Sequence, residues 1–324
     1  LSDAGVIVER VRDQGGEAVR AYAERFGERV PGEPLVLGRP DMNAALDALS
    51  PDDRAVLERT GDRIRAFARA QRDAILPVDV PIPGGRAGHT VEPIENAGCY
   101  APAGRYPLPS SVLMTAVTAR VSGCSRVVVA SPGADPVALA AAAIADADEF
   151  LAVGGAHAVA ALAHGFTGFE RCDMIAGPGN RWVTAAKQLV SGLVGIDMLA
   201  GPSELLVVAD ETADPGLIAA DLLAQAEHDT DAIPMLVTTS ASIADAVDES
   251  IAQRLRSLPT RATAREALGN GFVCVVDSLE SACAAADTIA PEHLEIMTRD
   301  AQTVAGWIRH AGAVFIGSAS AEVL

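Results

Sequence analysis

Two hydrophobic patterns follow each other along the chain. Up to about residue 75, apolar residues recur at helical spacing, as at Val8, Val11 and Val19 and later at Leu57 and Ile64. This pattern predicts helices. From about residue 99 onward, short β-branched runs alternate with Ala-rich stretches. Strands separated by helical crossovers form parallel sheets that are covered on both faces, so the second pattern predicts an α/β fold.

The elements can be placed from these patterns. Strands are expected at residues 126–130, 150–153, 174–176, 205–209, 235–239, 272–276 and 313–316. Helices are expected at residues 136–145, 182–190, 215–227 and 243–255. The Pro- and Gly-rich stretch 77–88 interrupts the pattern and marks a boundary. We therefore expect a helical region and linker over residues 1–90, a Rossmann-like domain over 91–205 and a second, related Rossmann-like domain over 206–324.

Composition narrows the function classes. The chain has 25 Lys and Arg against 43 Asp and Glu, a net charge of −18, which disfavours nucleic acid and anionic membranes as partners. It has neither a signal-peptide pattern nor an apolar run long enough to span a bilayer, so we expect a cytoplasmic protein. Five scattered cysteines without a CxxC pair are expected to be small buried hydrophobes in a reducing compartment.

Three Gly-rich turns lie near the predicted strands. They are Gly-Gly-Ala-His (154–157), Gly-Pro-Gly-Asn (177–180) and Gly-Pro-Ser-Glu (201–204). We expect all three at strand ends, where ligands of parallel sheets bind and helix N-termini present N–H groups. The turn at 177–180 directly precedes a predicted helix and is the best candidate for such a place, although no GxGxxG motif is present.

Two polar clusters stand inside apolar stretches. Gln225 and His228 are three residues apart in a predicted helix, so both project from one face, and this spacing suits two ligands of one metal ion. Glu292 and His293 follow Pro291 at the entry to a strand, where a fixed backbone can aim an acid and a base into a pocket. Together the clusters predict acid/base chemistry beside a metal.

From about residue 90 onward, the chain resembles the histidinol dehydrogenase family through seven motifs in the same order. They are GCYAPAGR (98–105), PSSVLM (109–114), VGGAHAVAALAHG (153–165), AGPGN (176–180), GIDMLAGPSE (195–204), AQAEH (224–228) and APEHLEI (290–296). The resemblance implies a zinc-containing, NAD-dependent enzyme that oxidises L-histidinol through L-histidinal to L-histidine in a four-electron reaction.

The resemblance also implies roles for the metal-site residues. Gln225 and His228 match two zinc ligands and so belong to the substrate site as well. An aspartate and a histidine beyond Leu324 are expected to supply the remaining ligands, because two neutral donors are too few for zinc. The family is further expected to form a homodimer in which the C-terminal segment of one subunit completes the site of the other.

Other residues match the family's catalytic and binding positions. Glu292 and His293 match its acid/base pair, and Ser203 matches a residue that contacts substrate. For the dinucleotide, Tyr100 and Asn180 match cofactor contacts, and His157 stands where the family usually has Gln. Further departures from the family pattern are Ala103 in place of Gly and Ala321 in place of Pro.

These departures leave alternatives open. One is a paralogous NAD-dependent dehydrogenase that acts on another small alcohol, such as sulfopropanediol. The GPSE and IDMLAG motifs resemble the histidinol branch more closely. The other alternative is a nucleotide-binding homologue without turnover, which the absence of further zinc ligands up to Leu324 would favour.

Overall fold

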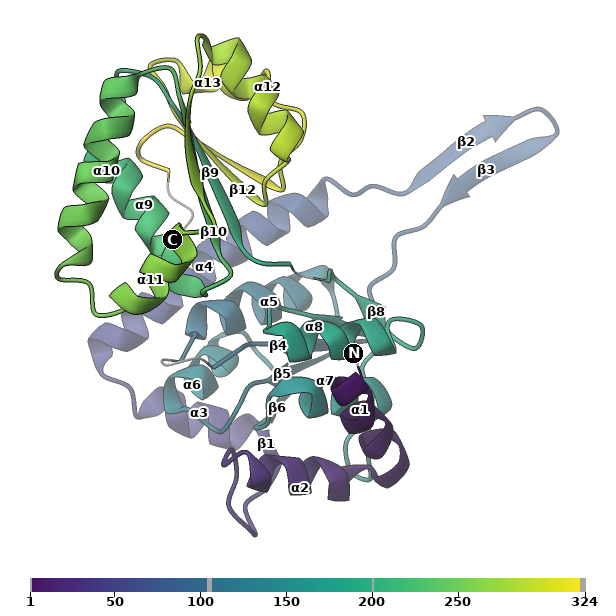
Figure 1. Ribbon diagram of the computed structural model, residues 1–324. Helices are drawn as coiled ribbons and strands as arrows, with labels where there is room; N and C mark the ends of the chain where they lie inside the picture. The colour runs from purple at the N-terminus through teal and green to yellow at the C-terminus, as the bar shows by residue number, and fades with distance from the viewer. Residues whose placement is uncertain (1, 104–106, 200, 321–324) are drawn as a thin grey trace. The chain divides into compact units, whose positions relative to one another are not determined.

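A computed structural model describes residues 2–103, 107–199 and 201–320 (Figure 1). The chain divides into two compact units, Leu1–Ala200 (unit 1) and Gly201–Leu324 (unit 2), each built around its own main sheet. Gly104, Arg105 and Ala321, which belong to the sequence comparison above, lie outside the described residues.

Unit 1 has a six-stranded sheet in the order β1-β6-β5-β4-β7-β8. All neighbouring pairs are parallel except β1 and β6, which are antiparallel. Its strands are β1 (Val36–Gly38), β4 (Asn96–Tyr100), β5 (Arg126–Ala130), β6 (Glu149–Leu151), β7 (Met174–Ala176) and β8 (Gly195–Ile196). Its helices are α1 (Ser2–Gln14), α2 (Gly16–Arg25), α3 (Arg39–Asp47), α4 (Pro51–Asp73), α5 (Pro109–Ser122), α6 (Pro136–Ile144), α7 (Gly155–His164) and α8 (Arg181–Val190).

Helices cover both faces of this sheet (Figure 1). One apolar layer joins it to α1, α2, α7 and α8, and the other joins it to α3, α4, α5 and α6. The helices of the first 75 residues are thus part of unit 1, whereas the sequence patterns set residues 1–90 apart as a region of their own. The stretch 77–88 contributes a separate hairpin of β2 (Val78–Ile82) and β3 (Gly85–His89), in which every residue is exposed.

Unit 2 has a five-stranded parallel sheet in the order β11-β10-β9-β12-β13. Its strands are β9 (Glu204–Ala209), β10 (Ile233–Thr238), β11 (Phe272–Val275), β12 (His293–Met297) and β13 (Ala313–Ile316). Helices α9 (Pro215–His228), α10 (Ala241–Leu255) and α11 (Arg261–Leu268) cover one face, and α12 (Leu279–Ile289) and α13 (Ala301–Ala305) cover the other.

The prediction of an α/β fold with two related parallel sheets is confirmed. In chain order, β4 to β8 and β9 to β13 both follow the spatial order 3-2-1-4-5, which is that of doubly wound nucleotide-binding folds. The seven expected strands are all present. The sequence analysis did not anticipate β1, β4, β8 or the hairpin, and it indicated β12 only as a strand entered after Pro291. Among the described residues, no helix is long and apolar enough to cross a membrane.

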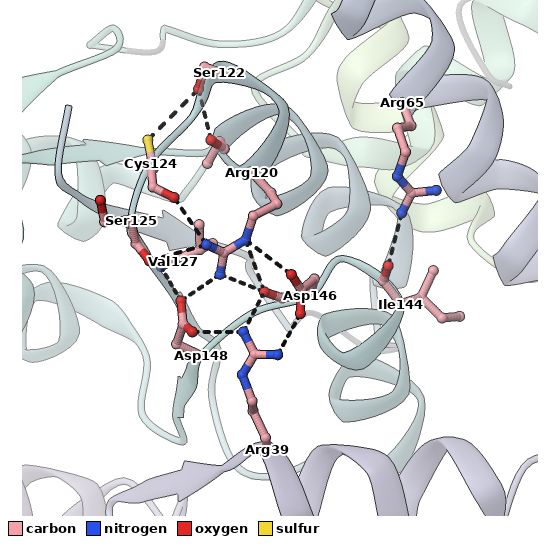
Figure 2. A network of polar contacts seen from close by, with 11 residues as sticks. Arg39, Arg65, Arg120, Ser122, Cys124, Ser125, Val127, Ile144, Asp146 and Asp148 are labelled. Carbon is pink, nitrogen blue, oxygen red and sulfur yellow. Dashed lines mark hydrogen bonds and ion pairs between the residues drawn. The ribbon is translucent and has the colours of Figure 1, made fainter. Parts of the chain in front are cut away.

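A polar network holds three segments of unit 1 together (Figure 2). Arg120 of α5 donates to the carboxylate of Asp148 at 2.5 Å and to the main-chain oxygens of Asp146 and Cys124 at 2.6 and 3.0 Å. Arg39, the first residue of α3, bonds the carboxylates of Asp146 and Asp148 at 2.5 and 2.8 Å. Asp148 also accepts the N–H of Val127, which begins the buried part of β5. The network therefore joins α3 and α5 to the segment that enters β6.

The two arginines are expected to differ in their contribution to stability. Arg120→Leu removes one donor from the Asp148 carboxylate and the donor of several main-chain carbonyl oxygens, which should lower the free energy of unfolding by about 2–3 kcal/mol. Arg39 is 49% exposed in its side chain against 24% for Arg120, so Arg39→Leu should cost less than about 1 kcal/mol. Urea unfolding measures both variants, and equal losses would contradict this ranking.

The same network gives a pH dependence. Burial raises the pKa of Asp148, but hydrogen bonds from Arg39, the Val127 N–H and Arg120 outweigh it and lower the pKa below its ordinary value. A lowered pKa in the folded state contributes stability above the unfolded value of about 3.9, and this is lost as pH falls through the folded pKa. Asp148→Asn should flatten the fall in stability below about pH 4. Thermal melts of both proteins across this range provide the measurement.

Candidate functional site

The predicted acid/base pair lies at the N-terminal edge of the unit 2 sheet. Glu292 directly precedes β12, and Ser203 directly precedes β9, which is the neighbouring strand. The Ser203 hydroxyl donates to the Glu292 carboxylate at 3.1 Å, and the Glu204 N–H reaches the same oxygen at 3.4 Å. The turn 201–204 thus leads into a strand. The sequence analysis expected it at the carboxyl edge of the sheet, where ligands of parallel sheets bind, and this prediction was wrong.

His293 is oriented by the same turn. Its Nδ1 lies 3.1 Å from the main-chain oxygen of Glu204 and 3.9 Å from the Glu292 carboxylate. Because a carbonyl oxygen can only accept, Nδ1 donates this hydrogen bond, and in the neutral ring Nε2 then carries the lone pair. The ring is partly buried and lies 6.1 Å, centroid to centroid, from the ring of Phe315. This hydrogen bond therefore decides which ring nitrogen of His293 carries the hydrogen in the neutral form.

The main chain of Glu292 is fixed from the other side by the start of β13. Its carbonyl oxygen accepts the Ala313 N–H at 2.9 Å, and the Gly312 N–H donates to the oxygen of Pro291 at 3.0 Å. A β-carbon on residue 312 would lie 2.6 Å from the Glu292 carbonyl oxygen, closer than real contacts allow. Gly312 is therefore required for this close approach of the two segments.

Gln225 and His228 occupy the last turn of α9, at the end of the helix that returns toward the start of β10. Gln225 is 0% exposed, and among the described residues neither its amide oxygen nor its amide nitrogen has a hydrogen-bond partner. His228 is the final residue of the helix and is exposed. A fully buried amide without a partner is costly, so a ligand that pairs with it is expected.

These two residues fit zinc as a pair of donors. An amide oxygen and an imidazole nitrogen are ligands that zinc accepts, and the buried amide of Gln225 has no competing partner among the described residues. Within the same residues, no group of three or more His, Cys, Asp and Glu side chains could hold a metal ion. The described residues therefore do not form a complete metal site by themselves.

The predicted dinucleotide contacts lie in unit 1 where the strand order reverses. Consecutive crossovers run from β4 to β5 and β6, and the chain then returns to place β7 on the other side of β4. Tyr100 ends β4, and the turn 177–180 follows β7. A β-carbon on Gly177 would overlap the carbonyl oxygen of Tyr100, so only glycine allows this approach, and Gly177 also has a φ of +123°. Ligands of doubly wound sheets bind at such a switch point.

The three predicted cofactor residues are placed differently around this point. Asn180 is exposed, and its side-chain oxygen caps α8 by accepting the N–H groups of Trp182 and Val183. The Tyr100 hydroxyl accepts the Gly155 N–H at 3.0 Å, and the Tyr100 side chain is buried. His157 is 2% exposed and lies 2.9 Å from the carboxylate of Glu28, which also accepts the N–H of Gly154. The structure thus places the His157 ring in the interior of unit 1, at the N-terminus of α7.

A buried lysine that the sequence analysis missed supports the turn 177–180. Lys187 is 3% exposed, and its ammonium donates to the oxygen of Gly177 at 2.7 Å and to the Asp197 carboxylate at 2.5 Å. Asp197 in turn accepts the Gly177 N–H at 2.7 Å. The signal was present in the sequence, because Lys187 falls on the apolar face of α8 with Val183, Ala186 and Val190.

Lys187→Met is expected to lower the free energy of unfolding by about 3 kcal/mol, because it leaves a carboxylate and a carbonyl oxygen without their donor. The double change Lys187→Met with Asp197→Leu should cost less than the sum of the two single changes, since the groups act on each other. Chemical denaturation of the four proteins in this cycle measures the coupling. Additive losses would show that the pair does not support the turn as described.

Comparisons with known proteins agree with the motifs. The family model described as histidinol dehydrogenase matches residues 2–324. A histidinol dehydrogenase from Aromatoleum aromaticum is 44% identical over 99% of this chain and 75% of its own length. One from Thermus thermophilus is 42% identical over 98% of this chain and 76% of its own.

Solved structures agree as well. The crystal structure of histidinol dehydrogenase from Elizabethkingia anophelis matches with a TM-score of 0.93 at 31% identity, over 99% of this chain and 75% of that one. An acetylating aldehyde dehydrogenase from Geobacillus thermoglucosidasius matches with a TM-score of 0.54 at 13% identity, over 99% of this chain and 82% of that one, and shares the fold alone. The resemblance inferred from the motifs is confirmed, and the chain belongs to the histidinol dehydrogenase family.

Proposed function

We propose that this protein oxidises L-histidinol through L-histidinal to L-histidine, with NAD as hydride acceptor and zinc at the substrate site. The observation that carries the proposal is the joining of Ser203, Glu292 and His293 at one sheet edge, in a chain of this family. An acid, a base and a hydroxyl donor held by main-chain contacts form a set suited to proton transfer at an alcohol and then at an aldehyde.

His293 is proposed to accept the hydroxyl proton of the alcohol. Its Nδ1–H bond to Glu204 fixes the tautomer, so that Nε2 is the basic nitrogen. Hydride loss from carbon requires removal of this proton, and imidazole is the side chain that most often serves as a general base in enzymes. The same nitrogen can return the proton to solvent between the two oxidations.

Glu292 is proposed to activate the water that adds to the aldehyde. Its carboxylate accepts from the Ser203 hydroxyl and the Glu204 N–H, which hold its position at the sheet edge. The side chain is 38% exposed, so water can reach the carboxylate. Addition of water produces the hydrate whose oxidation yields the carboxylic acid.

Gln225 and His228 are proposed to hold zinc and thereby to bind the substrate. When bound, zinc would act as a Lewis acid that anchors the nitrogen donors of histidinol. Tyr100, Asn180 and the turn 177–180 are proposed to receive NAD in unit 1. His157 is proposed to support that site from the interior, through the N-terminus of α7, which Glu28 and Tyr100 also bond. The homodimer and the cytoplasmic location remain predictions.

The proposed activity is tested by NADH formation with L-histidinol in zinc-loaded protein, with sulfopropanediol as the competing substrate. We expect turnover of histidinol to histidine with two NADH per substrate and about one zinc per chain. His228→Ala should abolish zinc binding. Turnover of sulfopropanediol in place of histidinol would establish the paralogous function, and no turnover of either would favour the binding homologue.

The roles of the acid/base pair make separate predictions. Glu292→Gln should still oxidise histidinol to the aldehyde level and should produce little NADH from histidinal supplied directly. His293→Asn should slow the alcohol step itself, by roughly 10²–10⁴-fold. Stopped-flow measurement of NADH from each substrate separates the two steps, and circular dichroism verifies that both variants are folded. Oxidation of histidinal at the wild-type rate by Glu292→Gln would assign the water to another base.

A further inference from the structure

A cavity that the proposed function does not use lies in unit 2, between the end of α10 and the start of α11. These two helices are adjacent in Figure 1, and the cavity between them has a volume of about 430 Å³. Among the described residues, it is lined by Ala252, Leu255, Arg256, Arg261 and Arg265. We call it the arginine cavity. None of these lining residues is acidic, although the chain as a whole has a net charge of −18.

The three arginines of the cavity have no partner in the part of the protein that the structure describes. All three are exposed, and their guanidinium groups form no hydrogen bond or ion pair with the described residues. Arg254 on the same helix shows the contrast, because its guanidinium donates to the Gly216 carbonyl oxygen at 3.1 Å. A guanidinium carries five N–H donors, so the three arginines can bind an anion without first breaking a contact within the protein.

The positions of these arginines concentrate positive charge. Arg261 is the first residue of α11, where the helix dipole favours a negative charge, and the first turn contains no acidic residue. Arg265 follows by four residues, so the two like charges share a face of the helix and repel each other. The N-cap residue Thr260 makes no side-chain bond to the first turn, and its hydroxyl donates to the Glu227 carboxylate instead. A bound anion would relieve this repulsion.

The chemistry and size of the cavity indicate which anion it would bind. A guanidinium matches the oxygens of a phosphate group with two parallel hydrogen bonds, and three guanidinium groups can surround one such group. The volume falls within the range of roughly 300–1,000 Å³ that is usual for small-molecule sites, so a carbon skeleton fits beside the phosphate. Ala252 and Leu255 offer this skeleton an apolar wall. A nucleic acid is disfavoured, because the net charge of the chain repels an extended polyanion.

We propose that the arginine cavity binds a small organic phosphate, with its phosphate oxygens held by Arg256, Arg261 and Arg265 and its apolar body packed on Leu255. The site is independent of the proposed function, because no residue assigned to substrate, zinc or NAD lines the cavity. A ligand of this class also gives a reason for the grouping of three unpaired arginines, which by itself only adds repulsion.

Isothermal titration calorimetry with phenyl phosphate tests the site. The wild-type protein should bind phenyl phosphate, should bind inorganic phosphate more weakly because that ion lacks the apolar body, and should not bind phenol. The affinity for phenyl phosphate should fall as NaCl is added. Arg256→Gln, Arg261→Gln and Arg265→Gln should each weaken binding by roughly 10-fold or more, because each change removes charged donors from the phosphate oxygens.

A matched control and thermal melts separate a ligand site from a structural role. Arg309 is an exposed arginine of unit 2 that does not line the cavity, so Arg309→Gln should bind phenyl phosphate as tightly as the wild type. The cavity arginines have no partner among the described residues, so their Gln variants should melt no lower than the wild type without ligand. Phenyl phosphate should raise the melting temperature of the wild type and of Arg309→Gln more than that of the cavity variants.

Several results would overturn the proposal. A wild-type protein that binds no phenyl phosphate at millimolar concentration has no such site, and equal affinity in all three cavity variants would place the ligand elsewhere. Equal weakening in Arg309→Gln would show a general effect of net charge, and lower melting temperatures of the cavity variants would show a structural role. Binding of phenol or of inorganic phosphate as tight as that of phenyl phosphate would refute an organic phosphate as the ligand. None of these measurements involves histidinol or NADH, so each result leaves the proposed function intact.

Discussion

The parallel pairing of β9 with β12 is the contact on which the proposed acid/base site depends. It sets His293 beside Leu205, so that the residues which precede the two strands meet although 89 positions separate Ser203 from Glu292. The hydrogen bonds of the site then follow from strand register. The Glu204 carbonyl oxygen accepts from the His293 ring, and the Glu204 N–H reaches the Glu292 carboxylate. A slip of one residue would turn His293 to the opposite face of the sheet. The chemistry is therefore built from main-chain geometry more than from side-chain packing.

The proposed sites of the two units lie at opposite edges of the same sheet topology. In unit 1 the carboxyl edge carries Gly177 and Asn180 at the point where strand order reverses, as expected for a doubly wound fold. In unit 2 the corresponding edge is bridged by Asp210, whose carboxylate accepts the N–H groups of Thr212 and Arg299. The acid/base pair lies instead at the amino edge of that sheet. Shared strand order thus does not imply a shared ligand position.

The sequence predicted those features that depend on local pattern. Strand and helix positions followed from β-branched runs and Ala-rich stretches, and the motifs indicated the family before any geometry was known. The sequence could not predict which distant segments lie next to each other in space. The strands β1 and β8 are short, at three and two residues, so they carry almost no periodicity. The bond from Glu28 to His157 joins distant segments, and no spacing rule indicates it. Lys187 was detectable, because a lysine on an apolar helix face requires a buried partner.

Gly312 shows how a residue without any functional group can limit the evolution of the proposed active site. Any side chain there would press on the carbonyl oxygen of Glu292 and move the acid away from Ser203. Substitutions that change the chemistry can occur at Glu292 itself. Position 312, which faces the Glu292 main chain, allows no residue other than glycine. Variants of this site with a new substrate would therefore have to arise with glycine retained at this position, which narrows the routes by which the site can diverge.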